Sequence, residues 1–166
     1  MAPLQPGDKF PSGVVFEHVK IENDNPKSAG MPYDYNASKE WANKKVALFS
    51  VPGAFTPGCQ GAHIPPILEK IDEVKSKADL VAIIGYNDGW VMCAWGKING
   101  ISDDKILFLS DSKTHFSKNH GWEAGVGDRN GRYAMVIDHG KVTYANVEKD
   151  FTQVTVSGVD PVLKAL

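Results

Sequence analysis

Continuous apolar runs separated by turn-forming residues set the pattern of this 166-residue chain. Residues 45–51, 80–86 and 106–110 are largely apolar, and the first of these runs is partly β-branched. Runs of this length and composition are typical of strands that are buried on both faces of a sheet. The three runs therefore predict the centre of one sheet.

Residues 132–138 and 141–147 alternate between apolar and polar positions. Between them stands His139-Gly140, and a glycine there supplies the positive φ that a tight hairpin turn requires. These segments predict a β-hairpin. Outer strands are predicted over residues 14–20, where the alternation is imperfect, and near residues 33–35.

Helical spacing follows two of the apolar runs. A helical segment is predicted from Pro65, with an apolar face for packing on the sheet. A second helix is predicted after the run that ends at Tyr86, and Gly100 is placed to stop it. The first face consists of Ile67, Leu68, Ile71 and Val74, and the second of Trp90, Val91, Ala94, Trp95 and Ile98. Short helices are predicted at residues 38–43, at 113–120 and from about residue 161.

The order of these elements predicts an α/β fold, with a mixed central sheet and helices on both faces. The length suits one domain, residues 1–166, with a full hydrophobic core. Polar residues 21–35 predict a long surface connection, and residues 121–131 a glycine-rich loop. Gly125-Val-Gly127 lacks the strand and helix that would bracket a phosphate-binding loop.

Charge and cysteine content exclude several classes of function. Eighteen basic and 20 acidic residues give a formal net charge of −2, which offers no electrostatic footprint for nucleic acid or for an anionic membrane. No apolar run is long enough to span a bilayer, and the N-terminal residues lack the pattern of a secretion signal. The two cysteines provide neither a disulfide framework nor the spacing of a zinc site, so no metal and no cofactor is expected.

The compartment expected from these features is a reducing one, the cytoplasm. The C-terminal residues Lys164-Ala-Leu166 resemble the S-K-L peroxisomal address only loosely. We therefore keep the peroxisome as a second possibility.

The stretch Pro-Gly-Ala-Phe-Thr-Pro-Gly-Cys, residues 52–59, carries the clearest chemical signal. Thr56 is a favoured N-cap residue and Pro57 is tolerated in the first helical turn, so Cys59 is predicted at a helix start. Unpaired N–H groups and the positive end of the helix dipole favour the thiolate there. A buried structural cysteine is the alternative.

A conflict with regular helix geometry follows Cys59. Pro65 and Pro66 lack the N–H groups that should bond to the carbonyls of Gly61 and Ala62. The turn that carries Cys59 is therefore predicted to be only loosely tied to the helix that begins at Pro65, and able to unwind.

The stretch resembles the P-x-x-x-T-x-x-C signature of the peroxiredoxin family, and its longer form resembles the type II branch of that family, also called type V, and the fungal members most of all. The resemblance covers nearly the whole chain. It also implies the thioredoxin fold with peroxiredoxin elaborations. Further matching segments are Asn87-Asp88, Ala94-Trp95-Gly96, 107–111, Arg132-Tyr133 and 136–140.

The resemblance implies a catalytic set of Cys59, Thr56, Arg132 and Pro52. Cys59 is expected to attack the peroxide as a thiolate and to become a sulfenic acid. Arg132 is expected to reach the sulfur, and a charge pair at about 4 Å with an effective dielectric of about 20 is worth roughly 4 kcal/mol. Thr56 is expected to cap the helix and to point its hydroxyl proton at sulfur or peroxide, while Pro52 keeps water away.

Three further residues are expected around this set. Gly58 contributes a backbone N–H that, with that of Cys59, can stabilise negative charge on the leaving oxygen. His63 recurs in the branch four residues after the cysteine, and packing is an equal alternative for it. Phe55 is placed with the substrate-binding residues, whereas Arg129 is interpreted as a surface charge.

Cys93 is interpreted as a small hydrophobic residue beside a core helix. Fungal relatives that form a disulfide carry their second cysteine just before G-x-P, and the corresponding residues here are Ser28-Ala29-Gly30-Met31-Pro32. The sequence therefore favours a one-cysteine cycle.

The function expected from all these features is a thiol-dependent peroxidase that reduces hydrogen peroxide and small alkyl hydroperoxides. An external thiol, which is glutathione, glutaredoxin or thioredoxin, resets Cys59, and the resemblance implies a homodimer. One rival is a redox sensor or chaperone-like protein that uses the same cysteine. A thiol–disulfide oxidoreductase is a weaker rival, because that chemistry needs C-x-x-C and Thr56 stands where the first cysteine would be.

Overall fold

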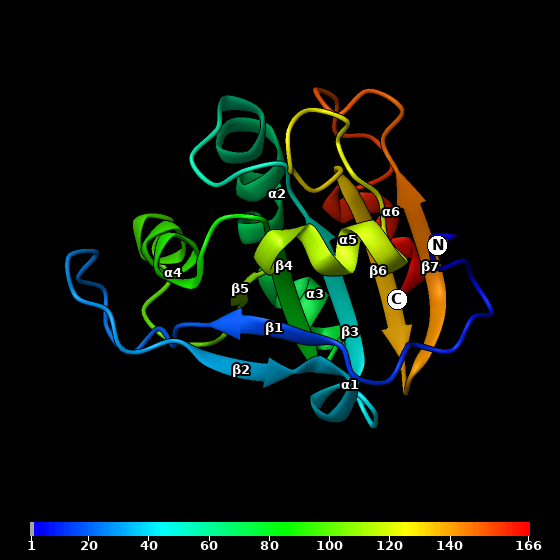
Figure 1. The fold of residues 1–166 in the computed structure, drawn as a ribbon, viewed down its shortest axis with the longest axis horizontal. Coiled ribbons are helices and arrows are strands. Elements are labelled where there is room, and N and C mark those ends of the chain that lie inside the picture. The colour runs from blue at the N-terminus through cyan, green and yellow to red at the C-terminus, as the bar shows by residue number, and fades with distance from the viewer. Residues whose placement is uncertain (1) are drawn as a thin grey trace.

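A mixed sheet of seven strands, in the order β2-β1-β5-β4-β3-β6-β7, forms the centre of the protein in a computed structural model that describes residues 2–166 (Figure 1). Strands β3, β4 and β5 are parallel, and the other neighbours pair antiparallel. The strands are β1 (Val15–His18), β2 (Tyr33–Asn36), β3 (Lys45–Ser50), β4 (Leu80–Gly85), β5 (Leu107–Ser110), β6 (Tyr133–Asp138) and β7 (Lys141–Val147).

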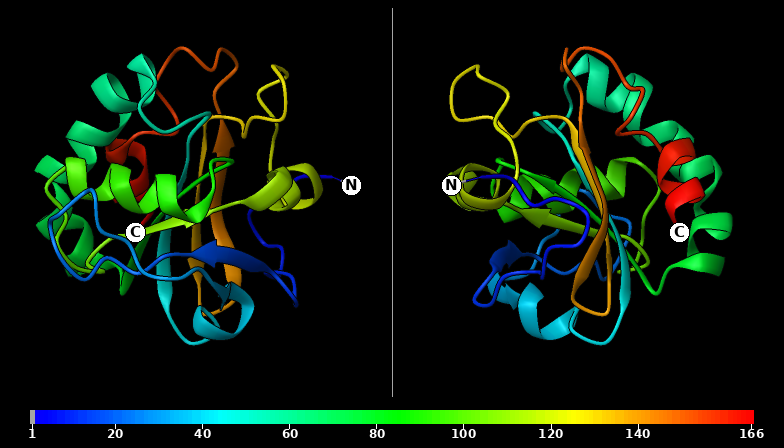
Figure 2. Two further views of the ribbon diagram at one scale, coloured as in Figure 1. Left: turned by 60° about the vertical axis from the view of Figure 1, so that its left-hand side comes forward. Right: turned by 90° about the vertical axis from the view of Figure 1, so that its right-hand side faces the viewer.

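Helices cover both faces of the sheet, as predicted (Figure 2). Helices α2, α3, α4 and α6 contribute to the core on one face, and α1 and α5 to the core on the other. The helical elements are α1 (Ala37–Glu40), η1 (Cys59–His63), α2 (Ile64–Glu69), α3 (Ile71–Lys77), α4 (Gly89–Ile98), η2 (Ser112–Thr114), α5 (His115–His120) and α6 (Val159–Ala165).

Alternation along the central strands creates the two cores. On β3, Ala47 and Phe49 face the core of α2 and α4, whereas Val46 and Leu48 face the core of α1 and α5. All four side chains are fully buried. Burial on both faces explains why the central strands are continuous apolar runs, because neither face meets water.

Two helix predictions are wrong in part. The helix predicted from Pro65 is divided at Lys70, where ψ is 15° and the regular bonding is interrupted between α2 and α3. On α4 the buried residues include Met92, Cys93 and Trp95, whereas Trp90 and Ile98 are 47% and 57% exposed. The predicted face of α4 is therefore partly its solvent face, because the helix packs on β5 and β1 along a narrower stripe than its apolar residues suggest.

The β6–β7 hairpin turns at His139 and Gly140, as predicted, and both residues have positive φ, 49° and 80°. In residues 2–166 no helix is long and apolar enough to cross a membrane.

Candidate active site

Cys59 is the first residue of η1, which follows β3 at one end of the sheet. Its side chain is fully buried. The loop that joins β3 to this turn contains Pro52, whose side chain is also buried. The sulfur therefore lies just beyond the end of a central strand and is shielded from solvent. The turn η1 leads into α2, which lies in the upper part of Figure 1.

Arg132 reaches this sulfur from the neighbouring strand. Because β6 pairs antiparallel with β3, with Tyr133 opposite Ser50, residue 132 stands beside the end of β3. The Arg132 guanidinium donates from Nη2 to Cys59 Sγ at 3.3 Å, and the residue is 3% exposed. A Cβ at Gly58 would lie 3.1 Å from the same Nη2, so glycine leaves room for this approach.

His63 lies on the other side of the guanidinium. Arg132 Nη1 donates to His63 Nδ1 at 2.9 Å, and His63 Nε2 lies 2.8 Å from the Ser157 carbonyl oxygen. Arginine can only donate and a carbonyl can only accept, so His63 is the neutral tautomer with its proton on Nε2. Burial first, and the Arg132 charge second, lower the pKa of His63 from 6.5 to about 4.

The loop between β7 and α6 completes the surroundings of Arg132. Arg132 Nε donates to the Phe151 carbonyl oxygen at 2.6 Å, and the Ser157 carbonyl from the same loop holds His63. The sequence pattern gives no indication of this loop's role. It lies far from residues 52–59 in the chain, and it contributes backbone carbonyls, which carry no signature in the side-chain pattern.

The irregular turn predicted around Pro65 and Pro66 is present as the π-helical η1. The Ile64 N–H bonds to the Cys59 carbonyl, five residues back, instead of the usual four. Gly61 and Ala62 are exposed, so water can bond to their carbonyls, which receive no N–H from Pro65 or Pro66. The wider π-helical turn next to the sulfur is thus compatible with the absence of these two N–H donors.

Thr56 differs from its prediction. Its backbone carbonyl accepts from Gln60 N at 2.8 Å and so starts the helix, but its hydroxyl donates to the Gly53 carbonyl at 2.7 Å. The hydroxyl proton therefore does not point at the sulfur, because the tight turn of residues 53–56 brings a stronger acceptor within reach. The hydroxyl oxygen keeps lone pairs that can accept a hydrogen bond from a bound molecule.

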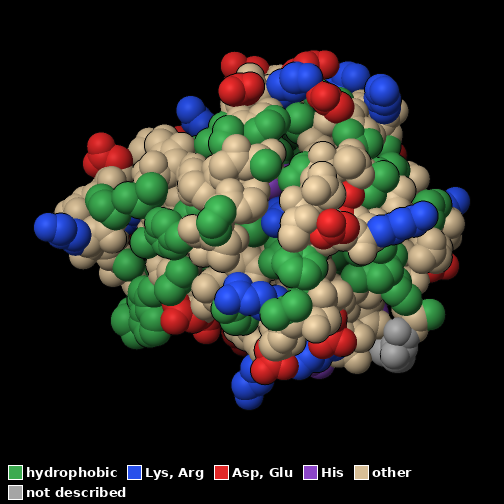
Figure 3. All heavy atoms as spheres, turned by 90° about the horizontal axis from the view of Figure 1, so that it is seen from above, with side chains coloured by type: hydrophobic (Ala, Val, Ile, Leu, Met, Phe, Trp, Pro, Cys, Tyr) green, Lys and Arg blue, Asp and Glu red, His purple; other side chains and the backbone are tan. Residues whose placement is uncertain are grey.

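A pocket of about 360 Å³ opens beside the buried sulfur, at the end of the molecule seen in Figure 3. Phe55 is not among its lining residues. Its φ is 63°, its side chain is 49% exposed, and its ring lies 6.3 Å from that of Trp95 on α4. The pocket is lined by Pro52, Thr56, Pro57, Gly58, Val126, Arg129, Arg132, Phe151 and Thr152.

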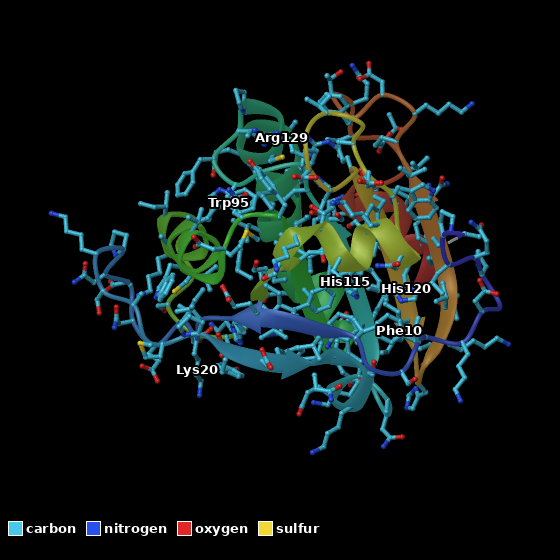
Figure 4. The ribbon with its side chains drawn as sticks, viewed as in Figure 1. Phe10, Lys20, Trp95, His115, His120 and Arg129 are labelled. Atoms are coloured by element: carbon cyan, nitrogen blue, oxygen red, sulfur yellow. The ribbon has the colours of Figure 1, made fainter. Side chains whose placement is uncertain are left out.

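Arg129 belongs to this lining and is not a free surface charge. It lies at the same end of the molecule as η1 (Figure 4), donates to the Pro52 carbonyl at 3.1 Å and stacks over the Tyr86 ring at 4.9 Å. A lone arginine in a polar loop gives no sign of such contacts in the sequence. Its guanidinium therefore helps to hold the backbone at Pro52 in position.

Cys93 is as deeply buried as Cys59, but its sulfur contacts a carbonyl oxygen and not an arginine. It is 1% exposed on α4, and its Sγ lies 3.9 Å from the Lys20 carbonyl oxygen. Burial raises the pKa of the Cys93 thiol. Both cysteines are free thiols. Within residues 2–166, no group of three or more His, Cys, Asp or Glu side chains is placed to hold a metal ion.

Comparison with known proteins decides what this arrangement is. The Redoxin family matches residues 5–163. Peroxiredoxin Pen c 3 of Penicillium citrinum is 49% identical over 98% of this chain and 99% of its own, and Peroxiredoxin AHP1 of Chaetomium thermophilum is 48% identical over 100% and 96%. The chain is a peroxiredoxin. It is therefore a thiol-dependent peroxidase, and the predicted family is confirmed.

A solved structure confirms the thioredoxin-like fold of this peroxiredoxin. Reduced Prx3 from Vibrio vulnificus, in complex with H₂O₂, is 35% identical and superposes with a TM-score of 0.83. The match covers 98% of this chain and 95% of the other.

Protonation of His63 should weaken the fold of this peroxiredoxin in mild acid. Its pKa is lowered from 6.5 to about 4, so the unfolded chain takes up a proton in this window while the folded chain does not. The free energy of unfolding therefore falls as the pH falls through it, by about 2 kcal/mol between pH 7 and pH 5. Urea denaturation at both pH values measures this loss.

His63→Gln should remove most of the pH dependence, while His115→Gln, at an exposed histidine of α5, should keep it. An equal loss of stability in His63→Gln and in the unsubstituted protein would contradict the assignment of a neutral, buried His63.

Backbone amides in the π-helical turn should exchange with solvent faster than those of the central strands. The turn has lost regular bonding, whereas residues 81–84 of β4 pair with β3 and β5 on both sides. Hydrogen–deuterium exchange read by mass spectrometry can compare residues 59–64 with residues 81–84. Equal protection in the two segments would show that the turn is as rigid as the sheet.

Proposed function

We propose that Cys59 is the peroxidatic cysteine, and that the 3.3 Å contact from Arg132 Nη2 to its sulfur is the observation that carries this assignment. The Cys59 thiolate attacks one peroxide oxygen, and the O–O bond breaks. The sulfur is oxidised to a sulfenic acid while the peroxide is reduced. The leaving oxygen takes a proton and departs as water or as an alcohol.

Each of the other catalytic residues has a distinct role in this proposal. Arg132 stabilises both the thiolate and the negative charge that develops on the leaving oxygen. The backbone N–H groups of Gly58 and Cys59 add donors at the helix start. Thr56 accepts a hydrogen bond from the peroxide through its free lone pair, and Pro52 shields the sulfur without offering a donor that would hydrate it.

The cycle uses one cysteine. An external thiol condenses with the Cys59 sulfenic acid, which releases water and leaves a mixed disulfide. A second thiol then attacks that disulfide and releases Cys59 as the thiolate. The raised pKa of the Cys93 thiol and the contact of its sulfur with the Lys20 carbonyl, with no arginine donor, support this cycle. So does the segment of residues 28–32, which contains no cysteine and whose Gly30 carbonyl accepts from Trp90 Nε1 at 3.1 Å.

The substrates are hydrogen peroxide and small alkyl hydroperoxides, for which a pocket of about 360 Å³ is large enough. A peroxide-consumption assay with glutathione alone, with glutaredoxin and glutathione, and with thioredoxin and its reductase tests the function and identifies the reductant. Steady turnover with one of them is expected. Reaction of a single equivalent of peroxide with no turnover by any donor would favour the alternative, a peroxide-sensing relay protein.

We also propose a homodimer that forms through the exposed apolar face of Phe55, Trp90 and Ile98, which are 49%, 47% and 57% exposed. In Figure 3 hydrophobic side chains gather on the side of the molecule where α4 lies. The strained backbone at Phe55 presents its ring outward beside this helix. Sedimentation equilibrium should give a dimer mass, and Trp90→Glu should give a monomer.

The cytoplasm is the proposed compartment. The peroxisome is the alternative, supported by a 39% identical relative from Lipomyces kononenkoae whose name describes it as a peroxisomal peroxiredoxin. Imaging of the protein with a fluorescent tag at its N-terminus distinguishes the two.

A further inference from the structure

The loop of residues 148–158 has no regular secondary structure, yet it provides two of the contacts that orient the active site. Its Phe151 carbonyl accepts from Arg132 Nε, and its Ser157 carbonyl is bonded to His63 Nε2. An irregular loop cannot place two carbonyls accurately unless something fixes its shape. The orientation of Arg132 therefore depends on whatever holds this loop in shape.

Glu148 stands at the start of the loop and binds its far end. One carboxylate oxygen accepts from the backbone N–H of Thr155 at 2.6 Å and from the N–H and hydroxyl of Ser157 at 2.8 and 2.7 Å. The other oxygen accepts from the Thr155 hydroxyl at 2.6 Å. Glu148 N in turn donates to the Arg132 carbonyl at 2.9 Å. The Glu148 side chain thus ties the far end of the loop to its start, and the Glu148 backbone N–H ties that start to Arg132, just before β6.

Glu148 is 8% exposed. Among residues 2–166 no cationic side chain lies within ion-pair distance of its carboxylate. Burial alone would raise the pKa of Glu148, but the hydrogen bonds from Thr155 and Ser157 outweigh burial and lower it. An ionised carboxylate that accepts only from neutral donors costs desolvation energy. The Glu148 carboxylate therefore serves to hold in place the groups of Thr155 and Ser157 that donate to it.

The geometry points to Glu148 as a positioning residue for the peroxidase reaction, acting through the loop of residues 148–158, His63 and Arg132 on the sulfur of Cys59. The guanidinium is planar, so two fixed donors determine the direction of the third. Phe151 fixes Nε and His63 fixes Nη1, which leaves Nη2 aimed at the sulfur. Glu148 holds the loop that supplies the Phe151 and Ser157 carbonyls. This inference rests on the proposed role of Cys59.

Glu148→Ala tests the inference. Without the carboxylate the loop loses its clamp, and Arg132 is no longer held by two fixed partners. We expect sulfenic acid formation at Cys59 to slow by about tenfold to 100-fold, since small misplacements of catalytic groups cost factors of this size. We also expect thiolate formation, followed by absorbance near 240 nm, to require a higher pH. Stopped-flow kinetics on protein shown to be folded by circular dichroism measure both.

Glu148→Gln is the conservative partner. Its carbonyl oxygen still accepts from the Thr155 and Ser157 N–H groups, and its amide can donate to the Thr155 hydroxyl, so most of the rate should return. Lys149→Ala, which removes an exposed side chain of the same loop, should stay within about twofold of the unsubstituted protein. If Glu148→Ala does not fold, the pair Thr155→Val and Ser157→Ala removes only the hydroxyl donors and should shift both readouts in the same direction.

Three results would overturn the inference: an unchanged rate and thiolate profile in folded Glu148→Ala, a Glu148→Gln variant as slow as Glu148→Ala, or additive effects of Glu148→Ala and His63→Gln. Additivity would mean that the two residues do not act through one chain of contacts. Failure of the proposed function looks different, because the unsubstituted protein would then form no sulfenic acid on Cys59 at all.

Discussion

Cys59→Ser is expected to lower the peroxidase rate to the uncatalysed level, a loss on the order of 10³-fold or more, because it removes the nucleophile while leaving the pocket in place. Cys93→Ser is the matched control. Its hydroxyl would face the Lys20 carbonyl in the same buried position on α4, and most of the activity should remain. Only Cys59 combines a helix start with an arginine donor at 3.3 Å.

Peroxide consumption with an excess of the thiol donor identified for the unsubstituted protein measures both variants. Comparable losses in Cys59→Ser and Cys93→Ser would contradict the one-cysteine cycle. Loss in Cys93→Ser alone would move the nucleophile to α4.

Arg132→Met should slow sulfenic acid formation by roughly 10²-fold to 10³-fold, the usual cost of removing one donor to a developing negative charge. Methionine keeps a long apolar stem, so the buried space between β6 and the Phe151 loop stays filled. The variant loses the donor to Cys59, the donor to His63 and the charge itself. Two separate changes are expected: the rate rises with pH over a more alkaline range, and the plateau at high pH is lower.

The plateau is the informative part of the Arg132→Met profile. A variant that recovers the full rate once the thiolate is formed would show that Arg132 controls protonation and takes no part in stabilising the transition state. Arg129→Met is the matched control, since Arg129 contacts the Pro52 carbonyl and has no contact with the sulfur. Its plateau should lie well above that of Arg132→Met.

The sequence was sufficient to predict the features that depend on local pattern. Apolar runs predicted the central strands, because burial on both faces leaves no room for polar positions. His139-Gly140 predicted the hairpin, and Pro65-Pro66 predicted an irregular turn, which is the π-helical η1. The family, the fold and the thiol peroxidase activity are confirmed by comparison with known proteins.

Features that depend on tertiary contact could not be predicted in the same way. The hydroxyl of Thr56 turns to the Gly53 carbonyl, and Phe55 packs beside Trp95 outside the pocket, because nearby backbone and aromatic partners are available only in the fold. The hydrogen bond from Arg129 to the Pro52 carbonyl likewise depends on the fold and could not be predicted from the sequence.

The Phe151 and Ser157 carbonyls are a further case. Backbone groups are present at every residue, so their placement beside Arg132 and His63 leaves no mark in the sequence. Glu148 was equally unremarkable in the sequence, where it is one acidic residue in a polar stretch.

The central claim is that Cys59 alone is oxidised by peroxide and awaits an external thiol. Intact mass and tandem mass spectrometry under non-reducing conditions, after one equivalent of hydrogen peroxide and a sulfenic-acid trap, test it most directly. The account predicts one trapped sulfenic acid, on Cys59, with Cys93 still a free thiol. A dominant Cys59–Cys93 disulfide, or a trapped oxygen on Cys93, would contradict it.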